Sequence, residues 1–184
     1  MKVKNVERYL NSFGKYIIKQ ARTNLSKGKK NVSKELYNSL KFDVIKRGGN
    51  YSVNFYMLDY GTFVDKGVSG TDQERTYRDY KGKTKVTDFK YTKKGPPIDI
   101  LSKWIKKRGI KPEGTGRGRS KKTGQYISGL AYLISKKIKR DGIKGISFFQ
   151  RPLELGLKNF GDEVLIGVKE DLIDGIKTQK IIVK

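Results

Sequence analysis

The sequence contains neither cysteine nor histidine among its 184 residues, and each absence excludes a class of chemistry. Without cysteine, the chain has no disulfide, no thiolate metal ligand and no thiol nucleophile. Without histidine, it lacks the usual general base near neutral pH and the commonest metal ligand. An enzyme reading must therefore use carboxylates, as a magnesium-dependent nuclease does. The candidates are Asp43, Asp59, Asp65 and Glu74. They show no nuclease-like spacing with a paired lysine, so we expect no catalysis, no metal and no cofactor.

Acidic residues are also scarce. The chain has 18 Asp and Glu against 42 Lys and Arg, which gives a net charge of +24, and only 35% of its residues are apolar. Such a charge repels itself unless an anionic partner, counterions or neighbouring subunits offset it. Nucleic acid is the first partner to consider, although a solvated lysine-rich surface has the same composition. Long hydrophobic runs are missing, so we expect neither a signal peptide nor a membrane span, and we expect a product made in the cytosol.

Apolar residues of the N-terminal segment recur at steps of three and four, which predicts an amphipathic helix over residues 3–27. They are Val3, Val6, Leu10, Phe13, Ile17, Ala21 and Leu25. A short helical turn is expected from Ser33. Two alternating runs then flank Gly48-Gly49-Asn50, and this pattern predicts an antiparallel hairpin. A glycine-punctuated aromatic turn, residues 60–70, follows the second strand and is expected to form a corner of the core.

Residues 71–95 break this regularity, because aromatic and basic residues alternate there with few aliphatic ones. We expect an extended arm or insertion, whose tyrosines pack locally or on a neighbouring subunit and which becomes ordered on assembly. After Pro96-Pro97, a helix is predicted to run to about Gly109. Residues 111–124 contain no apolar residue and predict a mobile basic loop.

The C-terminal part returns to helical spacing. A helix is predicted over 126–140 and closed by Gly142, and another is predicted from Pro152 to about Asp174. A final strand from Ile176 to Val183 would complete the sheet. The pattern as a whole predicts a single α+β domain spanning 1–184.

Three short segments occur in an order that resembles a known family. They are Leu36-Tyr37-Asn38-Ser39-Leu40, Tyr60-Gly61-Thr62-Phe63-Val64-Asp65-Lys66-Gly67 and Ser147-Phe148-Phe149-Gln150-Arg151-Pro152-Leu153-Glu154. Together they resemble the tail-completion, neck and head-to-tail joining proteins of tailed bacteriophages. In that family, a Pro-Phe-Leu-Arg-Pro-Ala-Leu-like segment opens the last helix. Here Ser147 replaces its first proline and the alanine is lost.

The resemblance covers roughly residues 1–70 and 125–175, and the longer, more basic middle suggests a variant such as those of crAss-like phages. The resemblance implies an α+β fold in which helices pack on a small curved antiparallel sheet. It also implies a structural virion protein of the neck, assembled in the host cytoplasm as a closed homo-oligomeric ring. Its implied neighbours are the portal or adaptor and the tail proteins, with no membrane partner. A non-specific DNA-binding or packaging protein is the alternative.

Candidate contact residues follow from these patterns. Aromatic residues of the turn, the arm and the third segment are candidates for a subunit interface, although a buried core is the other reading of the third segment. The interface candidates are Tyr60, Phe63, Tyr77, Tyr80, Phe89, Tyr91, Phe148, Phe149 and Arg151. The basic loop suggests non-specific contacts with DNA phosphates, and a solvated loop or a contact with acidic virion proteins is equally compatible with it. The phosphate candidates are Arg117, Arg119, Lys121 and Lys122.

Overall fold

The computed structural model describes residues 4–28, 33–110, 117–119 and 126–179, and within them the α+β class is confirmed. The chain divides into two compact units. Unit 1 comprises Met1–Gly61, Arg78–Lys83 and Ser147–Lys184, and unit 2 comprises Thr62–Tyr77 and Thr84–Ile146. The single domain that the sequence led us to expect over residues 1–184 stays a prediction. None of the described helices is long and apolar enough to cross a bilayer.

The N-terminal helix α1 (Lys4–Lys27) is the first long element of unit 1, as its periodicity predicted. Its apolar stripe is buried at Phe13, Ile17, Ala21 and Leu25, while the lysines between them are exposed. Burial of each large apolar side chain contributes about 1.5–3 kcal/mol. The stripe therefore fixes which face of α1 meets the rest of unit 1.

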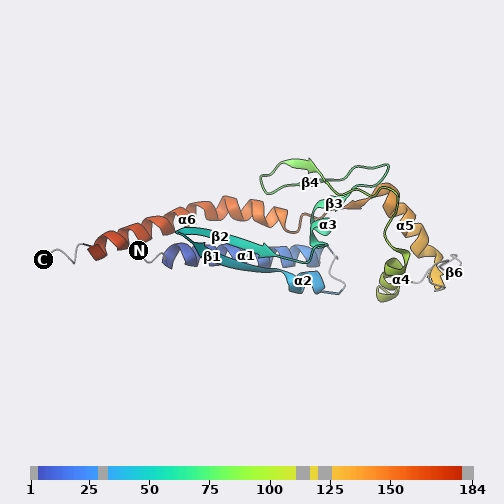
Figure 1. The fold of residues 1–184 in the computed structure, drawn as a ribbon, viewed down its shortest axis with the longest axis horizontal. Helices are drawn as coiled ribbons and strands as arrows, with labels where there is room; N and C mark the ends of the chain where they lie inside the picture. The colour runs from blue at the N-terminus through green and yellow to red at the C-terminus, as the bar shows by residue number, and fades with distance from the viewer. Residues whose placement is uncertain (1–3, 29–32, 111–116, 120–125, 180–184) are drawn as a thin grey trace. The chain divides into compact units, whose positions relative to one another are not determined.

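The predicted hairpin is also confirmed. Strands β1 (Lys41–Arg47) and β2 (Asn50–Tyr56) pair antiparallel, with Phe42 opposite Phe55. Gly48 and Gly49 both have positive φ, which a two-residue hairpin turn requires and glycine adopts without strain. The short helix α2 (Glu35–Ser39) precedes β1. The hairpin packs against α1 (Figure 1).

The C-terminal helix α6 (Gln150–Gln179) runs along α1 and packs against it (Figure 1). Two glycines of α6 allow this close packing. A Cβ at Gly156 would lie 3.0 Å from Phe13 Cε2, and one at Gly167 would lie 2.6 Å from Tyr9 Cδ2. Phe160 fills the space between them and stacks edge-on against Phe13 at 5.8 Å.

Unit 2 is built around short elements. Helix α3 (Gly61–Lys66) leads into β3 (Gly67–Val68), which pairs antiparallel with β8 (Ile143–Lys144). Helices α4 (Ile98–Lys107) and α5 (Gly129–Asp141) pack on each other. Gly109 and Gly142 follow these two helices with positive φ and end them, as the sequence predicted. Between β3 and α4 lie β4 (Thr76–Arg78) and β5 (Thr84–Val86), which pair with each other.

Four expectations need correction. The strands form separate two-stranded pairs instead of one sheet. Residues 126–128 are strand β7 (Tyr126–Ser128), so α5 begins later than predicted. Arg117–Arg119 form β6, which pairs with β7, where a loop was expected. Residues 176–179 continue α6, where the alternation of Ile176 and Thr178 had suggested a strand, because one helical turn satisfies its backbone groups without a partner strand. The rest of that expected strand lies outside the described residues.

Candidate functional site

Residues 71–77 and 84–95 of the expected arm belong to unit 2, and hydrogen bonds hold them to the rest of that unit. Ser69 donates its backbone N–H to the carbonyl of Phe89 at 2.7 Å, and Tyr91 returns a bond to Ser69 at 2.9 Å. The Thr87 hydroxyl, which is buried, donates to the Gly67 carbonyl at 2.9 Å. These bonds and the burial of Tyr77 correct the expectation that the segment needs a neighbouring subunit to become ordered.

The nine interface candidates divide by exposure. Tyr60, Phe63, Tyr80 and Arg151 are exposed, and Phe89 and Tyr91 are half-buried. Phe63 and Phe89 pack edge-on, with their ring centroids 4.5 Å apart, so each ring already has an aromatic partner inside unit 2. Burial raises the pKa of the Tyr91 phenol, and burial and the charge of Glu35 together raise that of Tyr60. The interface prediction therefore stays a prediction for the exposed members.

Phe148 and Phe149 belong to the core, and this corrects their assignment to a surface. Phe148 is fully buried, and its carbonyl accepts a bond from Asn24 Nδ2 on α1 at 3.5 Å. Phe149 packs edge-on against Phe55 of the hairpin at 5.3 Å. Ser147 adopts a left-handed φ of 46°, which turns the chain into α6. The core reading of this segment, which the sequence had left open, is the one that holds.

Residues 150 and 154, at the start of α6, hold the turn at residues 78–83 in place. Sequence reasoning had missed this contact. Glu154 receives a bidentate pair from Arg78, at 3.0 Å from Nε and 2.7 Å from Nη2. Gln150 Oε1 accepts a bond from the Tyr80 N–H at 3.0 Å. The buried Asp79 closes the turn by accepting from the N–H groups of Lys81 and Lys83. Within unit 1, α6 therefore begins with polar groups that fix this turn.

The other predicted contacts are only partly described. Arg117 and Arg119 lie on β6, but the description extends to their backbone alone. Lys121 and Lys122 lie outside the described residues. Their contact with phosphates stays a prediction.

The carboxylates weighed for a nuclease differ in their environments. Asp65 is buried, whereas Asp43, Asp59 and Glu74 are exposed. In the part of the chain that the structure describes, no group of three or more acidic side chains is arranged to hold a metal ion.

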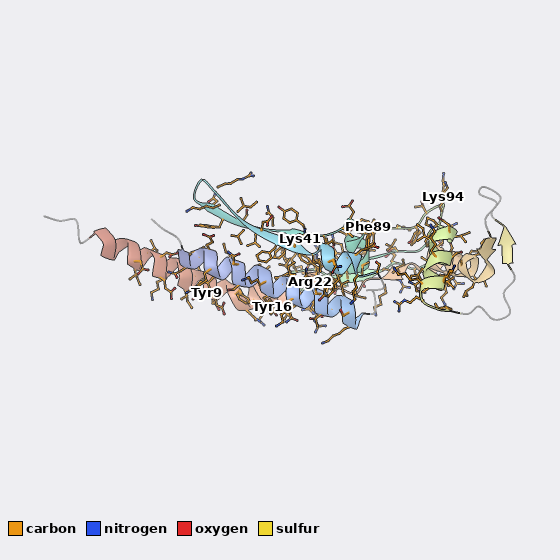
Figure 2. The ribbon with its side chains drawn as sticks, turned by 90° about the horizontal axis from the view of Figure 1, so that it is seen from below. Tyr9, Tyr16, Arg22, Lys41, Phe89 and Lys94 are labelled. Atoms are coloured by element: carbon orange, nitrogen blue, oxygen red, sulfur yellow. The ribbon has the colours of Figure 1, made fainter. Side chains whose placement is uncertain are left out.

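A basic groove of about 870 Å³ lies between α1 and the α2–β1 segment of unit 1. Its rim carries five cationic side chains and one carboxylate. The lining residues are Lys15, Ile18, Lys19, Arg22, Thr23, Ser26, Lys27, Tyr37, Leu40, Lys41, Phe42 and Asp43. Arg22 and Lys41 reach it from α1 and from the start of β1 (Figure 2).

Arg22 is held rigidly in this basic groove. Its Nε donates to the Tyr37 carbonyl and its Nη2 to the Leu40 carbonyl, each at 3.1 Å. Its guanidinium also lies 5.1 Å from the centre of the Tyr37 ring, within the range of a cation–π interaction. The i, i+4 spacing of Lys15 and Lys19 was visible in the sequence, but their meeting with Lys41 depends on where the hairpin packs.

The outer face of α6 is the second surface that stands out in unit 1. Leu165, Ile166 and Leu172 are 68%, 50% and 51% exposed. Leu155, Leu157, Val168 and Ile173 extend this apolar face along the helix. From 155 to 173 the helix rises about 27 Å at 1.5 Å per residue. Exposed apolar surfaces of this kind are typical of sites at which proteins contact one another.

No protein-family model matches this chain, and no curated protein and no solved structure matches it either.

Proposed function

We propose that the chain is a structural, non-catalytic protein of a tailed-phage virion, which assembles through copies of itself into a closed ring at the head-to-tail junction. The observation that carries the proposal is the apolar outer face of α6, residues 155–173. Leucine and isoleucine side chains exposed to this extent gain about 25 cal/mol for each Å² that a partner removes from water. A second copy is a partner that is always present at the concentration of the chain itself.

The ring geometry follows from the chemistry of the two surfaces. The stretch 155–173 of α6 also carries the exposed charges of Lys158, Asp162 and Lys169, so the surface that it meets must accommodate charged groups as well as apolar ones. In a cyclic ring, each subunit offers two different surfaces to its two neighbours. The apolar face on one copy would then meet a different surface of the next copy, for which the exposed Tyr60, Phe63 and Tyr80 are candidates. The resemblance of the three sequence segments to phage neck proteins supports a position of this ring between the portal or adaptor and the tail.

The test is assembly of the purified chain, measured by light scattering coupled to size-exclusion chromatography and by negative-stain microscopy. The wild type is expected to form a ring, and Leu165→Glu with Leu172→Glu is expected to remain monomeric. The matched control is Ile100→Glu with Leu133→Glu, because these residues of unit 2 are exposed to a similar extent, 58% and 54%. This control should leave assembly unchanged.

Two results would overturn the proposal. A wild type that remains monomeric at all accessible concentrations, or a ring that survives the α6 substitutions, would remove the observation on which the proposal rests. Mass spectrometry of purified particles tests the location separately, because absence of the chain from virions would exclude a neck component.

A further inference from the structure

The lysines of the basic groove form a line along one face of α1. Lys15, Lys19 and Lys27 are separated by multiples of four residues, and Thr23 continues the line between them. At 1.5 Å per residue, successive positions lie about 6 Å apart along the helix. Lys41 faces them from β1 across the groove. The cations are therefore spread along the length of the groove and do not converge on one position. This arrangement suits a linear polyanion.

These lysines have no carboxylate partners in the described part of the chain. Arginines elsewhere do have carboxylate partners, for example Arg8 with Glu170, Arg78 with Glu154 and Arg140 with Asp141. Asp43 is the single acid among the residues that line the groove. Cations that converge without neutralisation repel one another, and an anionic ligand removes this repulsion.

The floor of the groove has a different chemistry from its rim. Four lining residues are apolar or aromatic: Ile18, Tyr37, Leu40 and Phe42. Ile18 and Leu40 are buried, so the half-buried rings of Tyr37 and Phe42 are the part of this floor that a ligand can contact. The Phe42 ring is half-buried and is held by Phe55, at 6.3 Å between centroids. An apolar and aromatic floor between lysines is the combination with which proteins hold single-stranded nucleic acid, since the lysines follow the phosphates and the rings contact the bases.

We propose that the basic groove of unit 1 binds a single-stranded segment of nucleic acid, with phosphates along Lys15, Lys19, Lys27 and Lys41 and bases over the apolar floor. In a duplex the base faces are stacked on one another, so only its phosphates could contact the groove, at the lysines of the rim. Arg22 contributes through a guanidinium whose orientation is fixed by the Tyr37 and Leu40 carbonyls. The site carries no side-chain amide that would read base edges, so binding is indifferent to sequence. It is distinct from the contacts predicted at residues 117–122.

The experiment measures fluorescence anisotropy of a labelled thymidine dodecamer with the full chain over a range of salt concentrations. An abasic strand of equal charge and a duplex of equal length are the comparison ligands. Single-strand binding loses affinity with salt at about 0.7 log units for each phosphate contact. Lys15→Glu with Lys19→Glu should reduce this slope by roughly 1.4 and weaken binding more than about tenfold.

The matched control is Lys103→Glu with Lys107→Glu, which places the same charge change at the same i, i+4 spacing on the exposed surface of α4. It should keep the slope of the wild type, and circular dichroism checks that both variants are folded. The thymidine strand should bind at least roughly fivefold more tightly than the abasic strand, because base stacking contributes to one and not to the other.

Equal losses in the two double variants would show that net charge alone attracts the nucleic acid, and this would overturn the site. An abasic strand or a duplex that binds as tightly as the thymidine strand would overturn the assignment to single strands. Neither result depends on ring assembly, so failure here is distinguishable from failure of the proposed function.

Discussion

The carboxylate of Asp171 on α6 accepts a hydrogen bond from the backbone N–H of Val6, in the first turn of α1, at 3.1 Å. Its other oxygen accepts from the backbone N–H and the side-chain amide of Asn5, at 3.2 and 3.0 Å. The first N–H groups of a helix have no partner within the helix, and a negative charge is favourable there. Asp171 is 2% exposed, so these bonds are shielded from water. A residue near the end of unit 1 therefore caps the helix that begins it.

Replacing Asp171 by alanine should lower the free energy of unfolding by about 1–3 kcal/mol, because it leaves buried N–H groups without an acceptor. Urea denaturation followed by circular dichroism measures the change. Asp162→Ala, at an exposed position of the same helix, is the control and should stay within about 0.5 kcal/mol of the wild type. Equal effects of the two substitutions would show that the cap contributes nothing specific.

The regular elements of unit 1 could be predicted because their signals are local. The apolar spacing of α1 and the Gly48-Gly49 turn need no knowledge of the rest of the chain, and both were confirmed. The Asp171 cap was not predictable, because its partners are 165 and 166 positions away in sequence. Phe148 and Phe149 show the same limit: aromatic residues look alike in a core and at an interface, and their partners decide between the two.

The expectation that residues 71–95 become ordered only on assembly was wrong because their partners, too, are distant in sequence or are backbone groups. Their order depends on backbone bonds such as Ser69 to Phe89, and such bonds leave no trace in hydrophobic spacing. The basic groove combines a local signal, which the sequence shows, with a contact between elements, which it does not show. Its lysines on α1 were visible as a periodic face, but the rings of its floor, Tyr37 and Phe42, come from α2 and β1.

Two glycines of α6 should respond to alanine in opposite directions. At Gly156, a Cβ would collide with Ile17 and lie 3.0 Å from Phe13, so Gly156→Ala forces α6 away from α1 and should cost about 1–3 kcal/mol. At Gly161, nothing lies within 4 Å, so Gly161→Ala should stabilise the exposed helix by about 0.5–1 kcal/mol. Thermal unfolding of both variants measures the two signs. A stabilising Gly156→Ala would contradict the close packing of the two helices.

The Thr87 hydroxyl should be necessary for the stability of unit 2. Thr87→Val keeps the shape of the side chain but leaves the Gly67 carbonyl without its donor, which should cost about 1–3 kcal/mol. Thr76→Val, at an exposed position of β4, makes the same chemical change and should be close to neutral. Limited proteolysis provides a second measurement, because weakening of this bond should speed cleavage within residues 71–95. If both variants are cleaved at the same rate, the Thr87 bond does not hold residues 71–95 to unit 2.

The last prediction concerns the pH dependence of the pair formed by Arg140 and Asp141 at the end of α5. Arg140 Nε donates to Asp141 Oδ1 at 2.6 Å. This hydrogen bond holds the pKa of the Asp141 carboxyl below its ordinary value of 3.8; the charges of Arg140, Lys137 and Arg75 act in the same direction, and desolvation opposes them. A carboxyl whose pKa is lower in the folded state stabilises that state above the ordinary pKa, and loses this contribution as the pH falls through the folded value. Asp141→Asn should therefore be less stable than the wild type at neutral pH. The two proteins should converge in acid well below 3.8, where the wild-type carboxyl is protonated too.

Denaturant midpoints for both proteins across this pH range measure the convergence. Arg140→Gln is the companion variant, because it removes the hydrogen bond and the nearest cation while leaving the carboxyl in place; it should reduce the pH-dependent part, and the charges of Lys137 and Arg75 retain the remainder. Added salt should also narrow the gap at neutral pH, since the Arg140 side chain is 60% exposed and its charge is screened by ions. A gap that stays constant from neutral pH into acid would mean that Asp141 stabilises α5 through its shape or its neutral hydrogen bonds, and not through its charge.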